Sequence, residues 1–369
     1  MKRSPRFWAG IGQALVLALV MGQRRMRSLT AAEARVIRVL LADPPGPERR
    51  RIREARAPRT TYQAIRLRAF ANRWIEERYI PHPSLFGSQR IRFVLAQPYS
   101  ERWNEAIRRL RSLDGLVTLW GSPETLFGVV FDLPSAPPVS NPCTDDLFRR
   151  SWIVSPDITS EGIIAYFDYE GAFSRWTLDL APLAYPRGLP VLNPTALPRS
   201  RADWLSIREL LTRPGLAAPL VGSSAFRTAG LSRRGRKVLA NGWVRHCVLP
   251  DLSELPPIRG YRPERIVFVT ATPLPGSDPR NLFTELVRLG RVAPFLFAYD
   301  SDRILFATLS PPPAPRAASN ESIVNLLSRH ASKVETVREA ITSFVPVVNH
   351  RYEKLPIPGM GQGNAANGR

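Results

Sequence analysis

The feature that most constrains this chain is an internal match between two distant segments. Residues 71–74 read Ala-Asn-Arg-Trp and residues 240–243 read Ala-Asn-Gly-Trp, and in both places a Pro follows seven residues after the Trp. Further on, residues 90–98 and 265–273 are identical at six of nine positions. Because the two matches occur in the same order and similar helix and strand patterns follow each, we predict that one structural unit is present twice.

Each copy is expected to begin with helices and to continue as a mixed α+β unit. The apolar periodicity predicts helices at 30–42, 48–57 and 59–72 in the first copy and at 201–211, 219–226 and 232–241 in the second. Next come strand, helix, strand and strand, at 91–96, 101–112, 116–120 and 126–131, and again at 266–271, 281–289, 293–298 and 304–308. This order begins a ferredoxin-like βαββαβ unit. We expect 163–169 to be the last strand of the first unit and 321–344 to be helical and to form the second helix of the second unit.

Proline-rich joints divide the chain into segments. We expect an apolar N-terminal extension at 1–26, a winged helix-turn-helix at 27–83, a ferredoxin-like domain at 88–180, a Pro-rich linker at 181–199, a second winged helix-turn-helix at 200–250, a second ferredoxin-like domain at 262–356 and a disordered tail at 357–369. The second winged helix-turn-helix is expected to be degenerate, since Gly235 inside its last helix costs about 1 kcal/mol relative to Ala. The predicted fold class is α+β, with tandem winged helix-turn-helix units each followed by a ferredoxin-like α+β domain.

Charge favours a polyanionic partner. The chain has 52 basic against 31 acidic residues, a formal net charge of +21, and only four of the basic residues are Lys. Arg forms planar, bidentate contacts with phosphate and with guanine edges, which Lys does not. A GC-rich genome would explain Arg over Lys, but it would not explain the net positive excess. Residues 24–79 alone hold 15 Arg against six acidic residues.

The third predicted helix divides its residues between two faces. A capping box at Thr30 and Glu33 starts the first helix, and Thr60 with Thr61 is suited to cap the third. The apolar positions predict a buried face made of Leu67, Phe70, Ala71 and Trp74. The polar positions predict a solvent-exposed basic face made of Arg59, Tyr62, Arg66 and Arg73. Asn72 is expected to form a left-handed C-terminal cap, and 74–80 to be the first strand of a wing.

Residues 29–81 resemble the winged helix-turn-helix of Lrp/AsnC-type transcription regulators. The likeness lies in a helix that begins Pro-Arg-Thr-Thr-Tyr at 58–62 and in the Arg-Trp-Ile step at 73–75. The α+β units resemble the effector-binding and oligomerisation domain of the same family. The resemblance implies contacts with duplex DNA by Arg59, Thr60, Thr61, Tyr62, Arg66 and Arg68. The basic segments add Arg73, Arg233, Arg234 and Lys237 to the predicted DNA contacts.

Two departures from that family limit what the resemblance implies. The chain is longer, and its second copy would let one chain imitate a two-fold dimer. The family's glycine-containing effector loop is not evident, so a small-molecule effector stays unidentified and a homo-oligomer stays open. Replacing Arg66 and Arg73 with Ala is predicted to weaken binding of duplex DNA by about 2 kcal/mol or more.

Motifs for catalysis are absent from the sequence. It contains no P-loop, dinucleotide fingerprint, nucleophile elbow or zincin motif, so we expect no catalytic residue, no cofactor and no metal. Two alternatives stay open: a replication initiator or other tandem winged-helix DNA-binding protein, and a decarboxylase-like enzyme of the haem-precursor pathway with the same architecture. The enzyme would need a basic, His-bearing pocket, and the four histidines are scattered.

The N-terminus and the cysteines bear on localisation. The apolar run at 7–20 follows Lys2, Arg3 and Arg6, and it is shorter than the roughly 20 residues a spanning helix needs. Translation beginning at Met21 or Met26 is our preferred interpretation, with a membrane anchor as the alternative. Two distant cysteines favour a reducing compartment. We therefore expect a cytoplasmic protein without membrane attachment.

Overall fold

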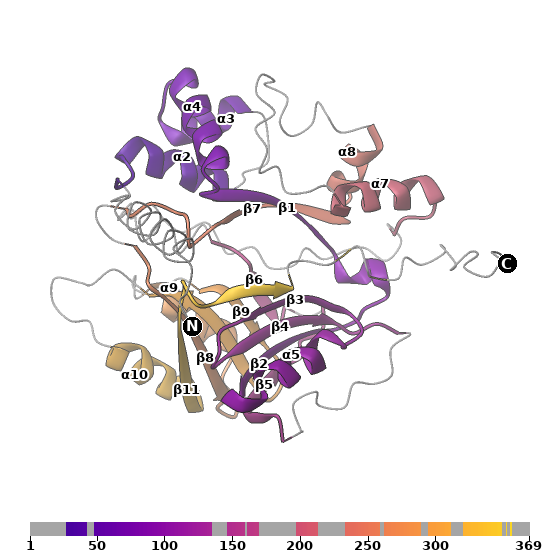
Figure 1. Cartoon of the computed structure of the whole chain (residues 1–369), viewed down its shortest axis with the longest axis vertical. Helices are drawn as coiled ribbons and strands as arrows, with labels where there is room; N and C mark the ends of the chain where they lie inside the picture. The colour runs from indigo at the N-terminus through magenta and orange to yellow at the C-terminus, as the bar shows by residue number, and fades with distance from the viewer. Residues whose placement is uncertain are drawn as a thin grey trace, which may run out of the picture.

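The protein has an α+β fold, as the sequence predicts, seen in a computed structural model of the whole chain (Figure 1). The structure describes residues 27–42, 48–134, 146–158, 161–169, 197–212, 233–258, 262–288, 294–310, 320–348, 352 and 355. The N-terminal extension, the predicted helix at 219–226 and the C-terminal tail lie outside the described residues. Among the helices that are described, none is both long and apolar enough to cross a membrane.

In the first half, three helices lead into one strand and then into a sheet. The helical part contains α2 (Ala31–Ala42), α3 (Glu48–Ala55), α4 (Arg59–Ala71) and then β1 (Ile75–Pro81). A short 3-10 turn at Pro83–Phe86 precedes β2 (Ile91–Pro98), and a second at Ser100–Arg102 precedes α5 (Trp103–Arg111). The half continues with β3 (Leu116–Gly121), β4 (Leu126–Phe131), β5 (Phe148–Val154) and β6 (Ile163–Tyr166).

The second half repeats this order among its described residues. It contains α7 (Arg201–Thr212), α8 (Arg233–Ala240), β7 (Val244–Pro250), β8 (Arg265–Pro273), α9 (Pro279–Arg288), β9 (Pro294–Tyr299), β10 (Ile304–Leu309), α10 (Asn320–His330), β11 (Ala331–Ala340) and β12 (Val345–Val348). The helices and strands predicted before residue 134, and those predicted at 201–211, 232–241, 266–271, 281–289, 293–298 and 304–308, therefore lie within a few residues of the observed ones.

Each half builds a sheet and lends one strand to the other. The two five-stranded sheets have the orders β12-β3-β4-β2-β5 and β11-β8-β10-β9-β6. Four strands of each sheet come from one half, in the ferredoxin-like arrangement. The fifth comes from the opposite half, since β6 pairs with β9 and β12 pairs with β3. The halves are thus interlocked by reciprocal strand exchange.

Two assignments made from the sequence are wrong. The last strand of the first ferredoxin-like unit is β5, whereas the segment predicted for that place contributes β6 to the other sheet. In the second half, only Asn320–His330 of the predicted helix is helical, and Ala331–Ala340 is strand β11. Pairing with β8 over most of its length overrides the helical propensity of that segment.

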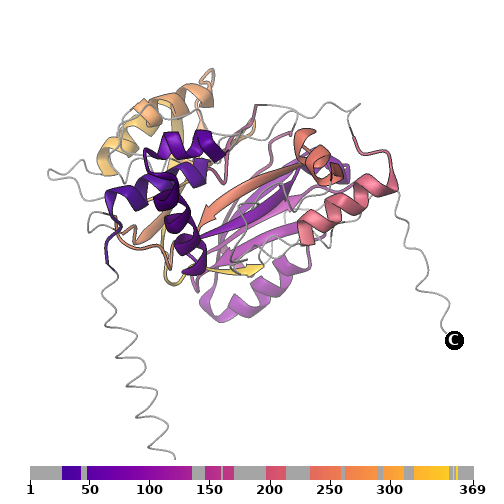
Figure 2. The same ribbon diagram turned by 90° about the horizontal axis from the view of Figure 1, so that it is seen from above.

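The strand after α4 forms no wing. Instead β1 pairs antiparallel with β7 of the other half over seven residues, from Ile75 opposite Pro250 to Pro81 opposite Val244. Trp74 and Trp243 set an offset of 169 residues between the copies. Arg78 lies opposite Cys247, its own equivalent by that offset, so a local two-fold axis passes through this pair. The pair of β1 and β7 is called the ribbon below. The helices that precede its strands form the two helical groups, α2–α4 and α7–α8, and Figures 1 and 2 place these groups at opposite ends of the ribbon.

The two sheets pack face to face beneath the ribbon. Their inner faces meet in one apolar core, where the rings of Phe127 and Phe268 lie 5.2 Å apart between centroids. Helix α5 covers the outer face of the first sheet, with Ala106 and Leu110 buried. Helices α9 and α10 cover the outer face of the second. The layers therefore run helix, sheet, sheet, helices, with the two helical groups outside this sandwich.

Candidate nucleic-acid interface

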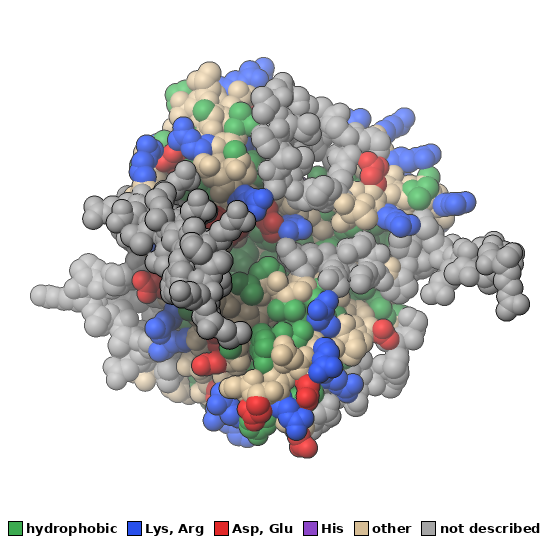
Figure 3. Space-filling model, viewed as in Figure 1, with side chains coloured by type: hydrophobic (Ala, Val, Ile, Leu, Met, Phe, Trp, Pro, Cys, Tyr) green, Lys and Arg blue, Asp and Glu red, His purple; other side chains and the backbone are tan. Residues whose placement is uncertain are grey.

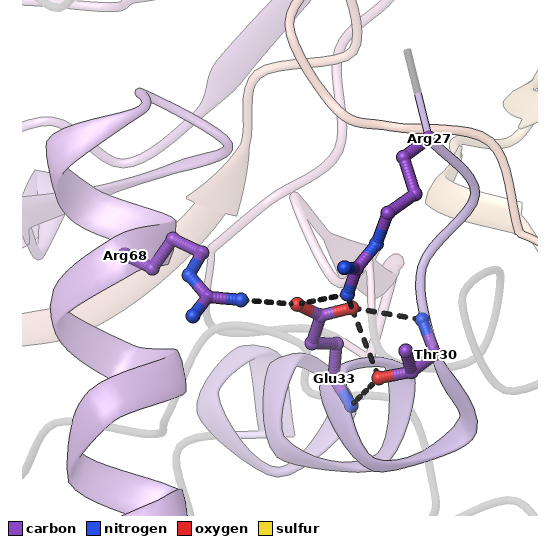
Figure 4. Close-up of polar contacts among 4 residues, drawn as sticks. All are labelled: Arg27, Thr30, Glu33 and Arg68. Carbon is purple, nitrogen blue, oxygen red and sulfur yellow. Dashed lines mark hydrogen bonds and ion pairs between the residues drawn. The ribbon is translucent and has the colours of Figure 1, made fainter.

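A buried carboxylate anchors the first helical group. Thr30 and Glu33 form the predicted capping box, in which Glu33 accepts hydrogen bonds from the Thr30 amide at 2.8 Å and from its hydroxyl at 2.9 Å. The Glu33 amide donates back to Thr30 Oγ1 at 3.2 Å. The same carboxylate pairs with Arg68 of α4 at 2.8 Å and with Arg27 at 3.3 Å (Figure 4). Glu33 thus ties the start of α2 to α4.

The surroundings of Glu33 favour its charged form. Burial opposes ionisation, but the hydrogen bonds from Thr30 and the charge of Arg27 outweigh it and lower the pKa of Glu33. A charged Glu33 therefore holds the guanidinium group of Arg68 in an ion pair, although the Arg68 side chain is half exposed. Arg68 was predicted to be a DNA contact, and part of its hydrogen-bonding capacity is already used internally.

The second helical group contains the same arrangement. Ser200 caps α7 through a bond from the Asp203 amide to its hydroxyl at 3.1 Å. Asp203 is buried and pairs with Lys237 of α8 at 3.2 Å. By the offset between the tryptophans, Lys237 is the equivalent of Arg68. Burial again opposes ionisation of Asp203, while bonds from Ser200 and Lys237 lower its pKa.

Both groups also end their last helix in the same way. The Arg73 amide bonds to the Phe70 carbonyl at 3.0 Å and the Trp74 amide to the Ala69 carbonyl at 2.8 Å. This is a Schellman motif with Arg73 in the left-handed region at φ 56°. Gly242 holds the equivalent position at φ 69°. The left-handed residue is therefore Arg73 and not Asn72, which has φ −89°.

The buried face of α4 differs from the predicted one. Its buried residues are Tyr62, Ile65, Arg66, Ala69 and Phe70. They follow i, i+3, i+4, i+7 and i+8, a regular helical stripe. Trp74 was misleading as a guide to this face, because the helix ends at Ala71 and the chain turns at Arg73 before Trp74 is reached.

Two predicted DNA contacts therefore lie inside the protein. Tyr62 has no exposed surface and Arg66 is only 8% exposed. Arg66 pairs with Glu48 of α3 at 3.5 Å. The prediction that these two side chains share an exposed basic face is wrong, because Glu48 lets α4 bury a cation among apolar side chains.

The exposed residues of α4 and α8 are chemically different. On α4 the solvent side includes Ala64, Leu67 and Ala71, and Leu67 is 42% exposed. The equivalents of Ala64 and Leu67 on α8 are Arg233 and Arg236, both exposed. Arg234 is exposed as well, and within the described part of the chain these three guanidinium groups have no carboxylate partner. Helix α8 thus presents to solvent the basic face expected of α4.

The remaining predicted contacts lie at the ends of α4 and on α8. Arg59 and Thr60 are exposed at the start of α4, Thr61 is partly buried, and Arg73 is exposed at its end. Lys237 is exposed while bound to Asp203, and its ammonium lies 5.4 Å from the centroid of the Trp243 ring. Figure 3 shows Lys and Arg side chains projecting over α7 and α8, with others over α2–α4. Sequence reasoning missed Arg236, which alignment of the two tryptophans would have placed opposite Leu67.

The described residues include no cluster of metal-ligating side chains, and two histidines lie beside carboxylates. Over the described ranges, no three His, Cys, Asp or Glu side chains gather closely enough to hold a metal ion. His330 bonds to Glu285 at 3.1 Å, and His246 lies 3.7 Å from the buried carboxylate of Glu77 within the β1–β7 ribbon. Both histidines are thus placed beside carboxylates in the framework of the fold.

Comparisons with known proteins give structural similarity at low sequence identity. No protein-family model matches the chain, and no curated protein sequence matches it. Two crystal structures of the siroheme decarboxylase NirDL are similar to it in shape, one of them in complex with an iron-uroporphyrin III analogue. They are 11% and 10% identical to this chain, with TM-scores of 0.38 and 0.40, and each match covers 84% of this chain and 90% of NirDL.

Proposed function

We propose that this chain is a sequence-specific, double-stranded-DNA-binding transcription regulator in which α8 makes the principal contact. The observation that carries the proposal is the solvent side of α8, where Arg233, Arg234 and Arg236 are exposed without a carboxylate partner in the described chain. Arg201 and Arg208 on α7 are exposed as well, and Figure 3 shows Lys and Arg side chains gathered over α7 and α8. Unpaired guanidinium groups on one short helix are suited to DNA phosphates and to guanine edges in the major groove.

The ribbon holds the two helical groups apart, an arrangement in which both could contact one DNA duplex. Helices α4 and α8 end just before β1 and β7, whose starts lie at opposite ends of a seven-residue antiparallel pair. Those starts are separated by about 20 Å along the ribbon. Reading helices in two successive major grooves on one side of DNA lie roughly 34 Å apart, and the ribbon places one helical group at each of its ends.

The unlike faces of the two helices predict an asymmetric DNA site. Two identical reading helices on a two-fold axis would recognise a palindrome. Here α8 presents Arg where α4 presents Ala64 and Leu67. We therefore expect one half-site to be bound mainly through α8, with Arg59 and Thr60 at the start of α4 contacting the other half.

Salt dependence of binding tests the proposal. We expect duplex affinity to fall steeply with salt, and Arg233, Arg234 and Arg236 all changed to Ala to weaken binding about 100-fold while lowering the salt slope by about 3. The control changes Arg108, Arg109 and Arg111 to Ala, which removes the same charge from the exposed side of α5, outside both helical groups. Equal losses from the two triple variants would reduce the proposal to nonspecific attraction by net charge.

Selected DNA fragments separate a regulator from the replication-initiator alternative. Sites near promoters indicate regulation, whereas clustered direct repeats at an origin indicate replication. The decarboxylase alternative is tested by the absorbance of the purified protein, which would show a bound tetrapyrrole.

A further inference from the structure

A cleft opens between the two sheets, away from both helical groups. One wall is β5 of the first sheet, and the other is formed by β8, β10 and β11 of the second. The cavity volume is about 230 Å³. Its polar lining includes Ser151, Thr270, Thr272, Arg303, Lys333 and Glu335. Trp152 adds an aromatic wall.

The floor of the cleft holds a buried hydroxyl group. Ile266 and Phe268 of β8 lie in the apolar core between the sheets, and Thr270 follows on the same face of the strand. Thr270 is 4% exposed, and its Oγ1 has no hydrogen-bond partner among the described residues. A buried hydroxyl group without a partner is costly, so its retention at a cleft indicates a partner that is not part of the fold.

Lys333 enters the cleft from a strained position. The pairing of β11 with β8 shifts between Ser332 and Glu335, which leaves Lys333 in a bulge. Its φ of 48° lies in the left-handed region, which a residue with a Cβ adopts at a cost. Gly would remove that strain, so a Lys here indicates that its ammonium is used.

Other contacts fix the width of the cleft. Asp300, in the β9–β10 turn, accepts a hydrogen bond from the Ser155 amide beyond β5 at 2.7 Å and from the Arg303 amide at 2.9 Å. Arg150 of β5 pairs with Glu335 of β11 at 3.4 Å. Both contacts join the two walls of the cleft. The ion pair with Arg150 also neutralises Glu335, the carboxylate that lines the cleft. Arg303, in the β9–β10 turn, and Lys333, in the bulge of β11, therefore line one cleft whose walls are joined by these contacts.

We propose that this cleft binds a small ligand bearing a carboxylate or phosphate group. The Thr270 hydroxyl donates to the oxyanion, and Arg303 and Lys333 neutralise it. The volume is below the roughly 300–1,000 Å³ of pockets for drug-sized ligands, so the ligand is a small metabolite. The site lies apart from α8, so it goes beyond DNA binding.

Titration calorimetry with inorganic phosphate and with malonate, at low ionic strength, tests the site and separates the two oxyanion classes. We expect one of them to bind with a Kd of about 1 mM or tighter. Thr270→Val and Lys333→Gln should each weaken that binding at least about tenfold. Arg338→Gln is the matched control, because Arg338 is exposed on the same strand outside the cleft and should leave binding unchanged.

Lys333→Gly adds a readout independent of binding. It should abolish oxyanion binding and raise the unfolding temperature of the ligand-free protein by about 2 °C, because it relieves the left-handed strain. Its DNA affinity without added anion should equal that of the wild type. The proposal is overturned if neither anion binds saturably, or if Arg338→Gln weakens binding as much as Lys333→Gln does.

Discussion

The two helical groups share a framework and differ in what they show to solvent. Each has a capping residue, a buried carboxylate that reaches a cation on its last helix, and a Schellman motif before a Trp. Yet Ala64 and Leu67 of α4 stand where α8 has Arg233 and Arg236. The shared residues are those that hold the helices together. The residues that differ are on the solvent side and do not hold the helices together, so we expect them to determine what each helix binds.

The buried carboxylates should give the largest effects. Replacing Glu33 with Ala removes a cap and two ion pairs, so we expect a loss of about 2–3 kcal/mol in the free energy of unfolding. Asp203→Ala removes the ion pair with Lys237 and the bonds that the carboxylate accepts from Ser200, but it keeps the amide bond to the Ser200 hydroxyl, and it should cost about 1–2 kcal/mol. Urea unfolding measures both. Glu54→Ala on α3, where Glu54 pairs with exposed Arg50, serves as the control, and a loss as large as that of Glu33→Ala would contradict this ranking.

The next largest effect is expected from a substitution at Arg66, which distinguishes a role in stability from a role in DNA contact. Arg66→Met keeps the apolar stem but removes the bond to Glu48, and we expect a loss of about 1–2 kcal/mol in stability. The DNA affinity of the folded variant should stay at the wild-type value, since Arg66 is buried. A weaker complex from a fully folded variant would restore Arg66 as a DNA contact.

The helix ends should respond with opposite signs. Arg73→Gly relieves a left-handed backbone and should raise the free energy of unfolding by about 1 kcal/mol, whereas Gly242→Ala should lower it by about 1 kcal/mol. Thermal unfolding of the two variants makes the comparison. Destabilisation by Arg73→Gly would show that the Arg73 side chain contributes more than its strained backbone costs.

Acid dependence is the smallest expected effect. The pKa values of Glu33 and Asp203 lie below their ordinary values in the folded chain. Their stabilisation is therefore present above the unfolded pKa values and is lost as pH falls through the folded ones. Glu33→Gln with Asp203→Asn should flatten the fall in stability below about pH 4.5. An unchanged acid profile in the double variant would argue against charged carboxylates at these positions.

Local elements could be predicted from the sequence, but the exchange between halves could not. Helices α2 to α5 and the strands β2 to β4 lie within a few residues of the predicted positions, and the capping box of Thr30 and Glu33 forms as predicted. Helix α4 differs, because it follows Pro58 without a side-chain cap from Thr60 or Thr61 and buries another face than the predicted one. The pairing of β1 with β7, of β6 with β9 and of β12 with β3 joins residues far apart in the chain, and nothing local encodes it. The segment after His330 forms strand β11 and not a helix, because it pairs with the edge of strand β8.

The candidate site could be predicted only in part. The Arg-rich composition and the capping box could be read directly, but the orientation of α4 could not. That orientation depends on Glu48, which pairs with Arg66 from another helix, and on the turn at Arg73, which takes Trp74 out of the helix. The basic face of α8 could be predicted by aligning Trp74 with Trp243, because that alignment places Arg236 at the position of Leu67.

Cross-linking from two equivalent positions tests most directly which helix meets DNA. Ala71 and Ala240 are both exposed, end their helices and correspond by the offset between the copies. A photoreactive amino acid is placed at each in turn, and the adducts with a bound duplex are quantified. We predict strong cross-linking from position 240 and weak cross-linking from position 71. Cross-linking mainly from position 71, or from neither, would contradict the assignment of α8 as the principal contact.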